Sequence, residues 1–174
     1  MYLDFFQLRE HPFRLTPDLD FLFMSRGHTR AKAYMDYTVV TSDGFVVVTG
    51  EIGSGKTTLL KKLVSELPDD VVVAKIEQTQ LTDVEFLRAV LAEFGRPAAG
   101  AVDKVELLGE LKSFLYDCFR MNRQVVLLVD EAQLLSERVL EEIRLISGIE
   151  TNGEKILSVV LAGQPELERI LELP

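Results

Sequence analysis

Four short apolar runs divide this chain, and between them apolar residues recur with a helical period. The runs cover residues 45–48, 71–76, 125–129 and 156–161, and valine, isoleucine and leucine dominate them. Continuous aliphatic runs of this length are typical of strands that are buried on both faces of a sheet. We therefore predict four strands.

Helices are predicted around these strands, because the apolar residues there lie three and four positions apart. Strands that alternate with helices specify a parallel sheet with helices on both faces, so the predicted fold class is α/β. The predicted helices cover residues 27–40, 56–67, 82–95, 104–121 and 136–148, with one more starting after Pro165.

Local signals refine two of these helices. Thr82 and Glu85 have the spacing of a capping box, which predicts a helix start at residue 82. The apolar residues expected to share the buried face of the helix over 104–121 are Val105, Leu108, Leu111, Leu115, Cys118 and Phe119.

The first strand leads into a sequence that is typical of phosphate-binding loops. Residues 50–57 have the sequence GEIGSGKT, which satisfies the pattern G-x-x-x-x-G-K-[ST] at every required position. Glycines let backbone N–H groups approach phosphate oxygens, and the following helix directs its positive dipole end at them. A glycine-rich turn before an ordinary helix is the alternative, but the strand, loop and helix stand in the order that the motif requires.

Each residue of this loop has a predicted role in binding ATP. Lys56 supplies a positive charge to the β- and γ-phosphates, and the Thr57 hydroxyl is a ligand for Mg²⁺. The residues predicted to bind the nucleotide are Gly50, Glu51, Ile52, Gly53, Ser54, Gly55, Lys56, Thr57 and Thr58.

The third strand ends in Asp130 and Glu131, at the edge of the sheet where ligands of open α/β folds bind. We predict that Asp130 orients the Mg²⁺ shell and that Glu131 is the general base for an attacking water. An acidic pair at this place is also able to cap the next helix. Its position after a complete phosphate-binding loop favours the catalytic interpretation.

Composition narrows the function further. The chain has 174 residues, enough for one domain with a real core, and no apolar run approaches the ~20 residues of a membrane span. Its start lacks the basic region of a secretory signal. One cysteine, Cys118, excludes an internal disulfide and fits a reducing cytoplasm. The net charge of −9 argues against a general nucleic-acid surface.

Three motifs resemble those of a known family, the AAA+ ATPases of the general secretion pathway protein A (ExeA-like) type. Residues 50–58 are one, DEAQ at 130–133 is the second, and VVLAGQPEL at 159–167 is the third. PFRLTPD at 12–18, with SRGH at 25–28, is similar to the same group, which includes ATPases of exosortase and polysaccharide-export loci. The likeness covers nearly the whole chain.

The resemblance implies a P-loop fold of the additional-strand type. It implies that the Asp-Glu strand lies between the P-loop strand and its neighbour. It also implies that Gln164, at the end of the fourth strand, is a catalytic sensor residue that reaches the γ-phosphate or the water; a plain turn residue before proline is the alternative.

The chain departs from the family pattern at several positions. Gln78 stands where an asparagine commonly ends the second strand. In related ATPases the residue at this position holds the catalytic glutamate in an inactive pose, and the amide of Gln78 is able to do the same. Gly148 stands where asparagine is usual, and the residues after His28 also differ. For His28 we weigh a place in the adenine pocket against a surface position at a helix start.

In the family, the segment after the fourth strand and its helix carries a fifth strand, an arginine finger and a helical lid. The resemblance thus predicts an ATPase core over residues 44–174 that lacks these parts, preceded by an aromatic and proline-rich segment and helix over 1–43 that pack on it. Arg169 is expected to be a solvated charge and Arg144 to pair with Glu141 or Glu142. Without a finger we expect a largely monomeric domain with slow hydrolysis.

The function we predict is an ATP-binding and ATP-hydrolysing domain, with Mg²⁺, that serves a secretion or envelope polysaccharide export system. We expect it in the cytoplasm, with a peripheral position at the inner membrane, through partners or a C-terminal region, as the alternative. The resemblance implies a homo-oligomer in the full-length protein and a partner in the envelope machinery. One alternative is a DNA-associated ATPase of the transposition-helper or origin-recognition kind, which the negative charge disfavours. The other is a nucleotide-dependent recruitment switch, which would not need Glu131.

Overall fold

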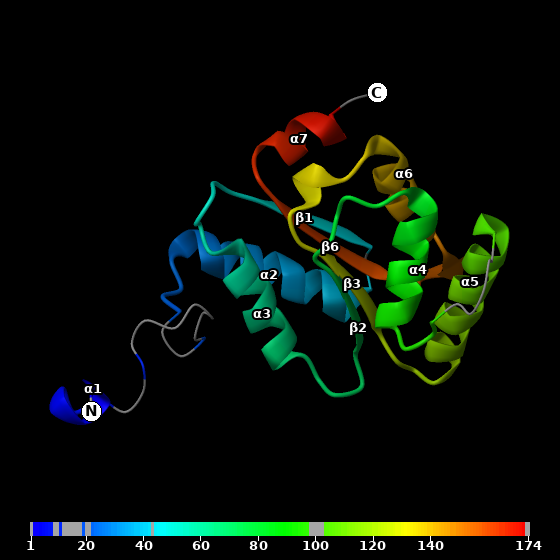
Figure 1. Cartoon of the computed structure of the whole chain (residues 1–174). Helices are drawn as coiled ribbons and strands as arrows, with labels where there is room; N and C mark the ends of the chain where they lie inside the picture. Colours follow the sequence, from blue (N-terminus) through cyan, green and yellow to red (C-terminus); the bar gives the residue numbers. More distant parts are fainter. Residues whose placement is uncertain are drawn as a thin grey trace.

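The computed structural model describes residues 2–8, 11, 19, 22–42, 44–97 and 103–172. Its centre is a sheet of four parallel strands in the order β1-β6-β3-β2. These strands are β1 (Phe45–Thr49), β2 (Val72–Ile76), β3 (Val125–Val129) and β6 (Ser158–Gly163). The predicted α/β class is confirmed, with helices on both faces of the sheet (Figure 1).

The predicted helices are present in the predicted order and with nearly the predicted bounds: α2 (Arg26–Thr41), α3 (Lys56–Glu66), α4 (Asp83–Glu93), α5 (Lys104–Arg120), α6 (Glu137–Ser147) and α7 (Glu166–Leu171). The described residues also contain α1 (Tyr2–Phe5) and the 3₁₀ helix η2 (Ala132–Leu134), which were not predicted. Ser136, at the start of the helix predicted over 136–148, is the N-cap of α6, and its side chain accepts a hydrogen bond from the backbone N–H of Val139.

The family resemblance implied that the strand ending in Asp130 and Glu131 lies between the P-loop strand and its neighbour, and this prediction is wrong. β6, not β3, pairs with the P-loop strand β1, and β3 lies between β6 and β2. Burial follows this order: β3 and β6 are buried at every position, whereas Phe45 of β1 is 39% exposed and β2 is only partly buried. The two fully buried strands lie at the centre of the sheet, and the two partly exposed strands lie at its edges.

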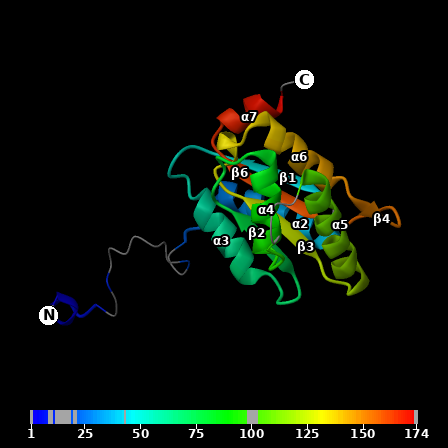
Figure 2. The same ribbon diagram turned by 45° about the vertical axis from the view of Figure 1, so that its right-hand side comes forward.

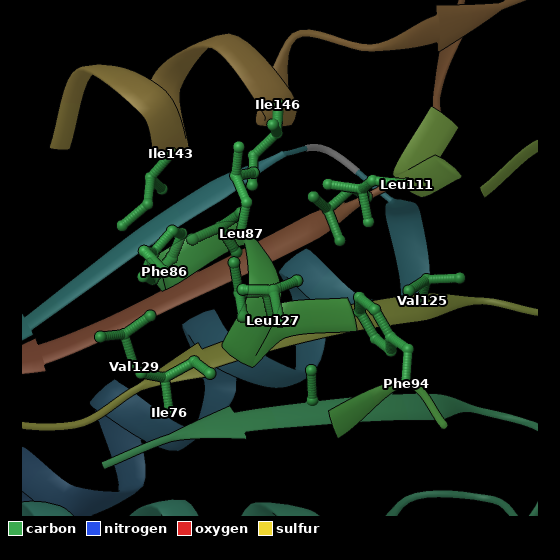
Figure 3. Packing of buried hydrophobic residues seen from close by; sticks show 14 of the residues in the cluster. Ile76, Phe86, Leu87, Phe94, Leu111, Val125, Leu127, Val129, Ile143 and Ile146 are labelled. Atoms are coloured by element: carbon green, nitrogen blue, oxygen red, sulfur yellow. The ribbon is translucent and has the colours of Figure 1, made fainter. Parts of the chain in front are cut away.

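Each face of the sheet carries its own core. On β3, Leu127 and Val129 face helices α4, α5 and α6, while Val126 and Leu128 face α2 and α3. Figure 3 shows Leu87 of α4 directed at the first of these faces. The alternation follows from the pleat of a strand, which directs successive side chains to opposite faces. The sheet is thus held rigid from both sides.

Two local predictions need correction. Val105 is 76% exposed, and Leu107 and Phe114 enter the core of α5 in its place and in that of Leu108 and Phe119, which are only partly buried. The fourth strand starts at Ser158 instead of residue 156. Before it, β4 (Glu150–Thr151) and β5 (Glu154–Lys155) form a hairpin that projects beside α5 and α6 (Figure 2). The sequence AAGA at 98–101, which predicts a linker, lies outside the described residues, as does the PFRLTPD sequence at 12–18.

The predicted capping box of α4 is present. The backbone N–H of Thr82 donates to Glu85 Oε2 at 2.8 Å, and Thr82 Oγ1 accepts from the Glu85 N–H at 3.3 Å. The first of these bonds lowers the pKa of the Glu85 carboxyl, because it favours the charged form.

Removing this cap should weaken the domain modestly. Thr82→Ala is expected to lower the free energy of unfolding by about 1 kcal/mol, because it leaves backbone donors of the first turn unsatisfied. Urea denaturation followed by circular dichroism measures the change. Thr29→Ala, on an exposed position inside α2, is the matched control and should cost less; equal losses would contradict a specific role of the cap.

Candidate nucleotide site

The loop between β1 and α3 has the backbone shape that its glycines predict. Gly53 and Gly55 have φ angles of 76° and 89°, in the left-handed region that favours glycine. Gly55 is the N-cap of α3, so the unpaired N–H groups of the first helical turn face the loop. The backbone therefore has the shape that binds anions at the N-terminus of a helix in other proteins.

Lys56 folds back over this loop. Its Nζ donates to the carbonyl oxygens of Gly50 at 2.7 Å and Glu51 at 3.0 Å. The N–H of Gly50 in turn donates to Gly163 O at the end of β6. The ammonium group thus lies at the mouth of the loop, and the loop is anchored to the central strands.

Thr57 and Asp130 meet although 73 positions separate them. The Thr57 hydroxyl donates to Asp130 Oδ2 at 2.7 Å, and the backbone N–H of Glu131 donates to Asp130 Oδ1 at 3.0 Å. Asp130 is only 4% exposed. A hydroxyl and a carboxylate side by side are the hard oxygen ligands that Mg²⁺ takes together with phosphate oxygens, so these residues fit that ion.

Glu131 and Gln164 lie at the same edge of the sheet as the loop. Glu131 has a φ of 51°, a left-handed conformation that is uncommon for a residue with a side chain. A cavity of about 380 Å³ opens here, and every residue that lines it belongs to the predicted set: Ile52, Gly53, Gly55, Lys56, Thr57, Thr58, Glu131 and Gln164.

Of the other residues singled out in the sequence, His28 contacts the phosphate loop, and Gln78, Arg144 and Arg169 do not line this cavity. His28, in the first turn of α2, approaches Ser54 O with Nε2 at 2.7 Å and Phe23 O with Nδ1 at 3.2 Å, so it contacts the loop backbone. Gln78 is exposed and lines a different cavity beside α4. Arg144 pairs with Glu141, as predicted, and Arg169 is exposed.

One polar residue of the site had no predicted role. The Gln133 Nε2 donates to Glu131 Oε2 at 2.7 Å, and its Oε1 accepts from the backbone N–H of Gln164 at 2.9 Å. The sequence signal was its place in the run DEAQ, two positions after Glu131.

The described residues contain neither a cluster of metal ligands nor a membrane-spanning helix. Within that part of the chain, no group of three or more His, Cys, Asp or Glu side chains is arranged to hold a metal ion. Among the same residues, no helix combines the length and the apolar character needed to cross a membrane.

The chain is similar to several known proteins. General secretion pathway protein A from Aeromonas hydrophila is 39% identical over all 174 residues, and the chain spans 32% of that protein's length. Among solved structures, Cdc6p from Pyrobaculum aerophilum aligns with a TM-score of 0.64 at 19% identity, over 92% of this chain and 43% of that one.

ORC2 from Aeropyrum pernix, in complexes with ADPNP and ADP, aligns with a TM-score of 0.60 at 18% identity, over 93% of this chain and 46% of that one. At these identities the two structures support the fold alone. The family model described as AAA domain matches residues 40–171. The chain therefore belongs to the AAA domain family of P-loop ATPases.

Proposed function

We propose that this chain binds ATP with Mg²⁺ and hydrolyses it, and that it drives a step of a secretion or envelope polysaccharide export system. The hydrogen bond between Thr57 and Asp130 carries the biochemical part of the proposal, because it joins the phosphate loop to the acidic strand end in one site. The similarity to general secretion pathway protein A supports the biological part.

In this proposal the residues of the site have separate roles in binding and in chemistry. The backbone N–H groups of the loop and Lys56 bind the phosphates, and Thr57 with Asp130 holds Mg²⁺, which neutralises charge on the phosphate oxygens when bound. Glu131 accepts a proton from the attacking water, and Gln164 donates to the γ-phosphate or the water. Helix α2 supports this core through the contact of His28 with the loop.

Single-turnover hydrolysis tests the biochemical proposal. The chain, in excess over radiolabelled ATP, should release phosphate slowly in the presence of Mg²⁺ and much more slowly when EDTA removes the ion. An excess of protein makes slow chemistry measurable without steady-state turnover. If ATP were lost no faster with the protein than in buffer alone, the assignment would be contradicted.

Glu131 favours an enzyme over a recruitment switch. A module that only binds nucleotide needs the loop, Lys56 and the Mg²⁺ ligands, but it does not need a carboxylate in the cavity beside them. We extend the proposal to a cytoplasmic location, a homo-oligomer in the longer protein and a partner in the envelope machinery.

Binding to duplex DNA separates the proposed function from the DNA-associated alternative. Because the net charge is −9, we expect no binding to duplex DNA at physiological salt, since phosphate contacts require clustered lysine and arginine. A gel-shift titration at low-micromolar protein measures this, with the salt concentration varied. A shift that weakens steeply as salt rises would favour the DNA-associated alternative.

A further inference from the structure

The side chain of Gln133 joins two parts of the site that the chain separates. Its amide nitrogen donates to the carboxylate of Glu131, and its amide oxygen accepts from the backbone N–H of Gln164, which follows β6. Of the side chains that the structure describes, Gln133 is the one that donates to this carboxylate. It contacts Oε2 and leaves the other oxygen for a different partner.

The chemistry of the two partners fixes the orientation of the amide. An ionised carboxylate only accepts hydrogen bonds and a backbone N–H only donates one, so the Gln133 nitrogen must face Glu131 and its oxygen must face Gln164. The reversed amide would place oxygen against oxygen and N–H against N–H. This arrangement needs a side chain with a donor and an acceptor on one carbon.

The far end of this bridge is rigid. Gln164 directly follows β6, whose residues are buried along its whole length. Gly163 leaves room for the bridge, because an ideal Cβ there would lie 3.0 Å from Gln133 Oε1 and 3.2 Å from the Gln133 backbone nitrogen. The Glu131 carboxylate is therefore held against the same central strand that anchors Gly50 of the phosphate loop.

We propose that Gln133 is a positioning residue that orients the Glu131 carboxylate toward the attacking water. The inference rests on the proposed ATPase function. Gln133 does not line the nucleotide cavity, so it acts on the rate of the chemical step and not on nucleotide affinity. It contacts Glu131 directly, whereas Gln78, the position that the family resemblance suggested for such a contact, lines a different cavity.

Two substitutions at one position separate the two hydrogen bonds. Gln133→Met keeps the length of the side chain and removes both bonds. Gln133→Glu keeps an oxygen for the Gln164 N–H but replaces the donor to Glu131 by a second carboxylate. Gln124→Met is the matched control, because Gln124 precedes β3 and donates to Val40 O, away from the site.

Single-turnover phosphate release and calorimetric titration with ADP give the rate and the affinity of each variant. We expect both Gln133 variants to lose about 10–100-fold in rate, the range found for partners that orient metal ligands, with ADP affinity within about threefold of wild type. Gln124→Met should match wild type in both. In a Glu131→Gln background, Gln133→Met should add little further loss, because the carboxylate that it orients is already absent.

Three results would overturn the inference. The first is wild-type rates in both Gln133 variants, and the second is a wild-type rate in Gln133→Glu alone, which would leave only a brace to Gln164. The third is a parallel loss of ADP affinity, which would indicate general damage to the site. A wild-type chain that binds ATP and releases no phosphate would instead remove the proposed function and this inference with it.

Discussion

Glu131→Gln is expected to bind ATP as well as wild type and to hydrolyse it about 10²–10⁴-fold more slowly, the range that a general base contributes. Glutamine keeps the shape of the side chain and an oxygen that accepts from Gln133, but it cannot take a proton from water. The loss should therefore appear in the rate of single-turnover phosphate release and not in the dissociation constant.

Glu137→Gln is the matched control for this substitution. Glu137 is exposed in the first turn of α6, and the exchange removes the same charge outside the cavity. Its rate should equal that of wild type. If Glu131→Gln released phosphate as fast as wild type, Glu131 would have no role as the base, and a different group would have to activate the water.

Lys56→Ala should remove most of the affinity for ATP and ADP. Truncating one partner of a desolvated charge pair costs about 2–5 kcal/mol, which corresponds to roughly a 30-fold to several-thousand-fold increase in the dissociation constant. The Nζ group also spans the loop carbonyls of Gly50 and Glu51, so the loop loses two internal hydrogen bonds. Isothermal titration calorimetry measures the affinity.

The control for Lys56 is a lysine on the same helix that lies away from the loop. Lys62 pairs with Glu66, one turn along α3, and Lys62→Ala should leave the affinity within about threefold of wild type. Circular dichroism should show the same helix content for both variants and wild type. Unchanged affinity in Lys56→Ala would contradict the assignment of the phosphate site.

The parts of the site that were predictable are those that neighbouring residues specify. The phosphate loop is a continuous motif whose glycines, lysine and threonine each have a local reason, and the strand before Asp130 is a single buried run. Because the carboxyl ends of parallel strands share one edge of a sheet, the class of fold alone predicts that the loop, Glu131 and Gln164 come together.

The strand order depends on pairing between distant segments, which local pattern does not determine. In α5, two overlapping stripes have helical spacing, and only packing against α4 selects the one with Phe114, whose ring stacks on Phe94 at 4.9 Å between ring centres. The hairpin was within reach of the sequence, because Asn152 and Gly153 are a typical turn pair and both have positive φ.

The contact of Gln133 with Glu131 was not predictable from the sequence for a different reason. Its contact with Glu131 depends on the left-handed backbone at Glu131, and nothing local predicts that conformation for a glutamate. The neighbouring 3₁₀ helix η2 then directs the amide back toward the carboxylate and the end of β6. The two hydrogen bonds of Gln133 are therefore visible only in the folded structure.

The central claim, that the loop between β1 and α3 is a nucleotide-phosphate site, is tested most directly by amide NMR. Titration of the chain with Mg·ADP should move the backbone N–H resonances of Gly53, Gly55, Lys56 and Thr57 more than any others, because these groups lie at the proposed phosphate contacts. The contradicting result is the absence of shifts, or the largest shifts around the cavity of about 610 Å³ beside β5 that Arg123 and Lys155 line.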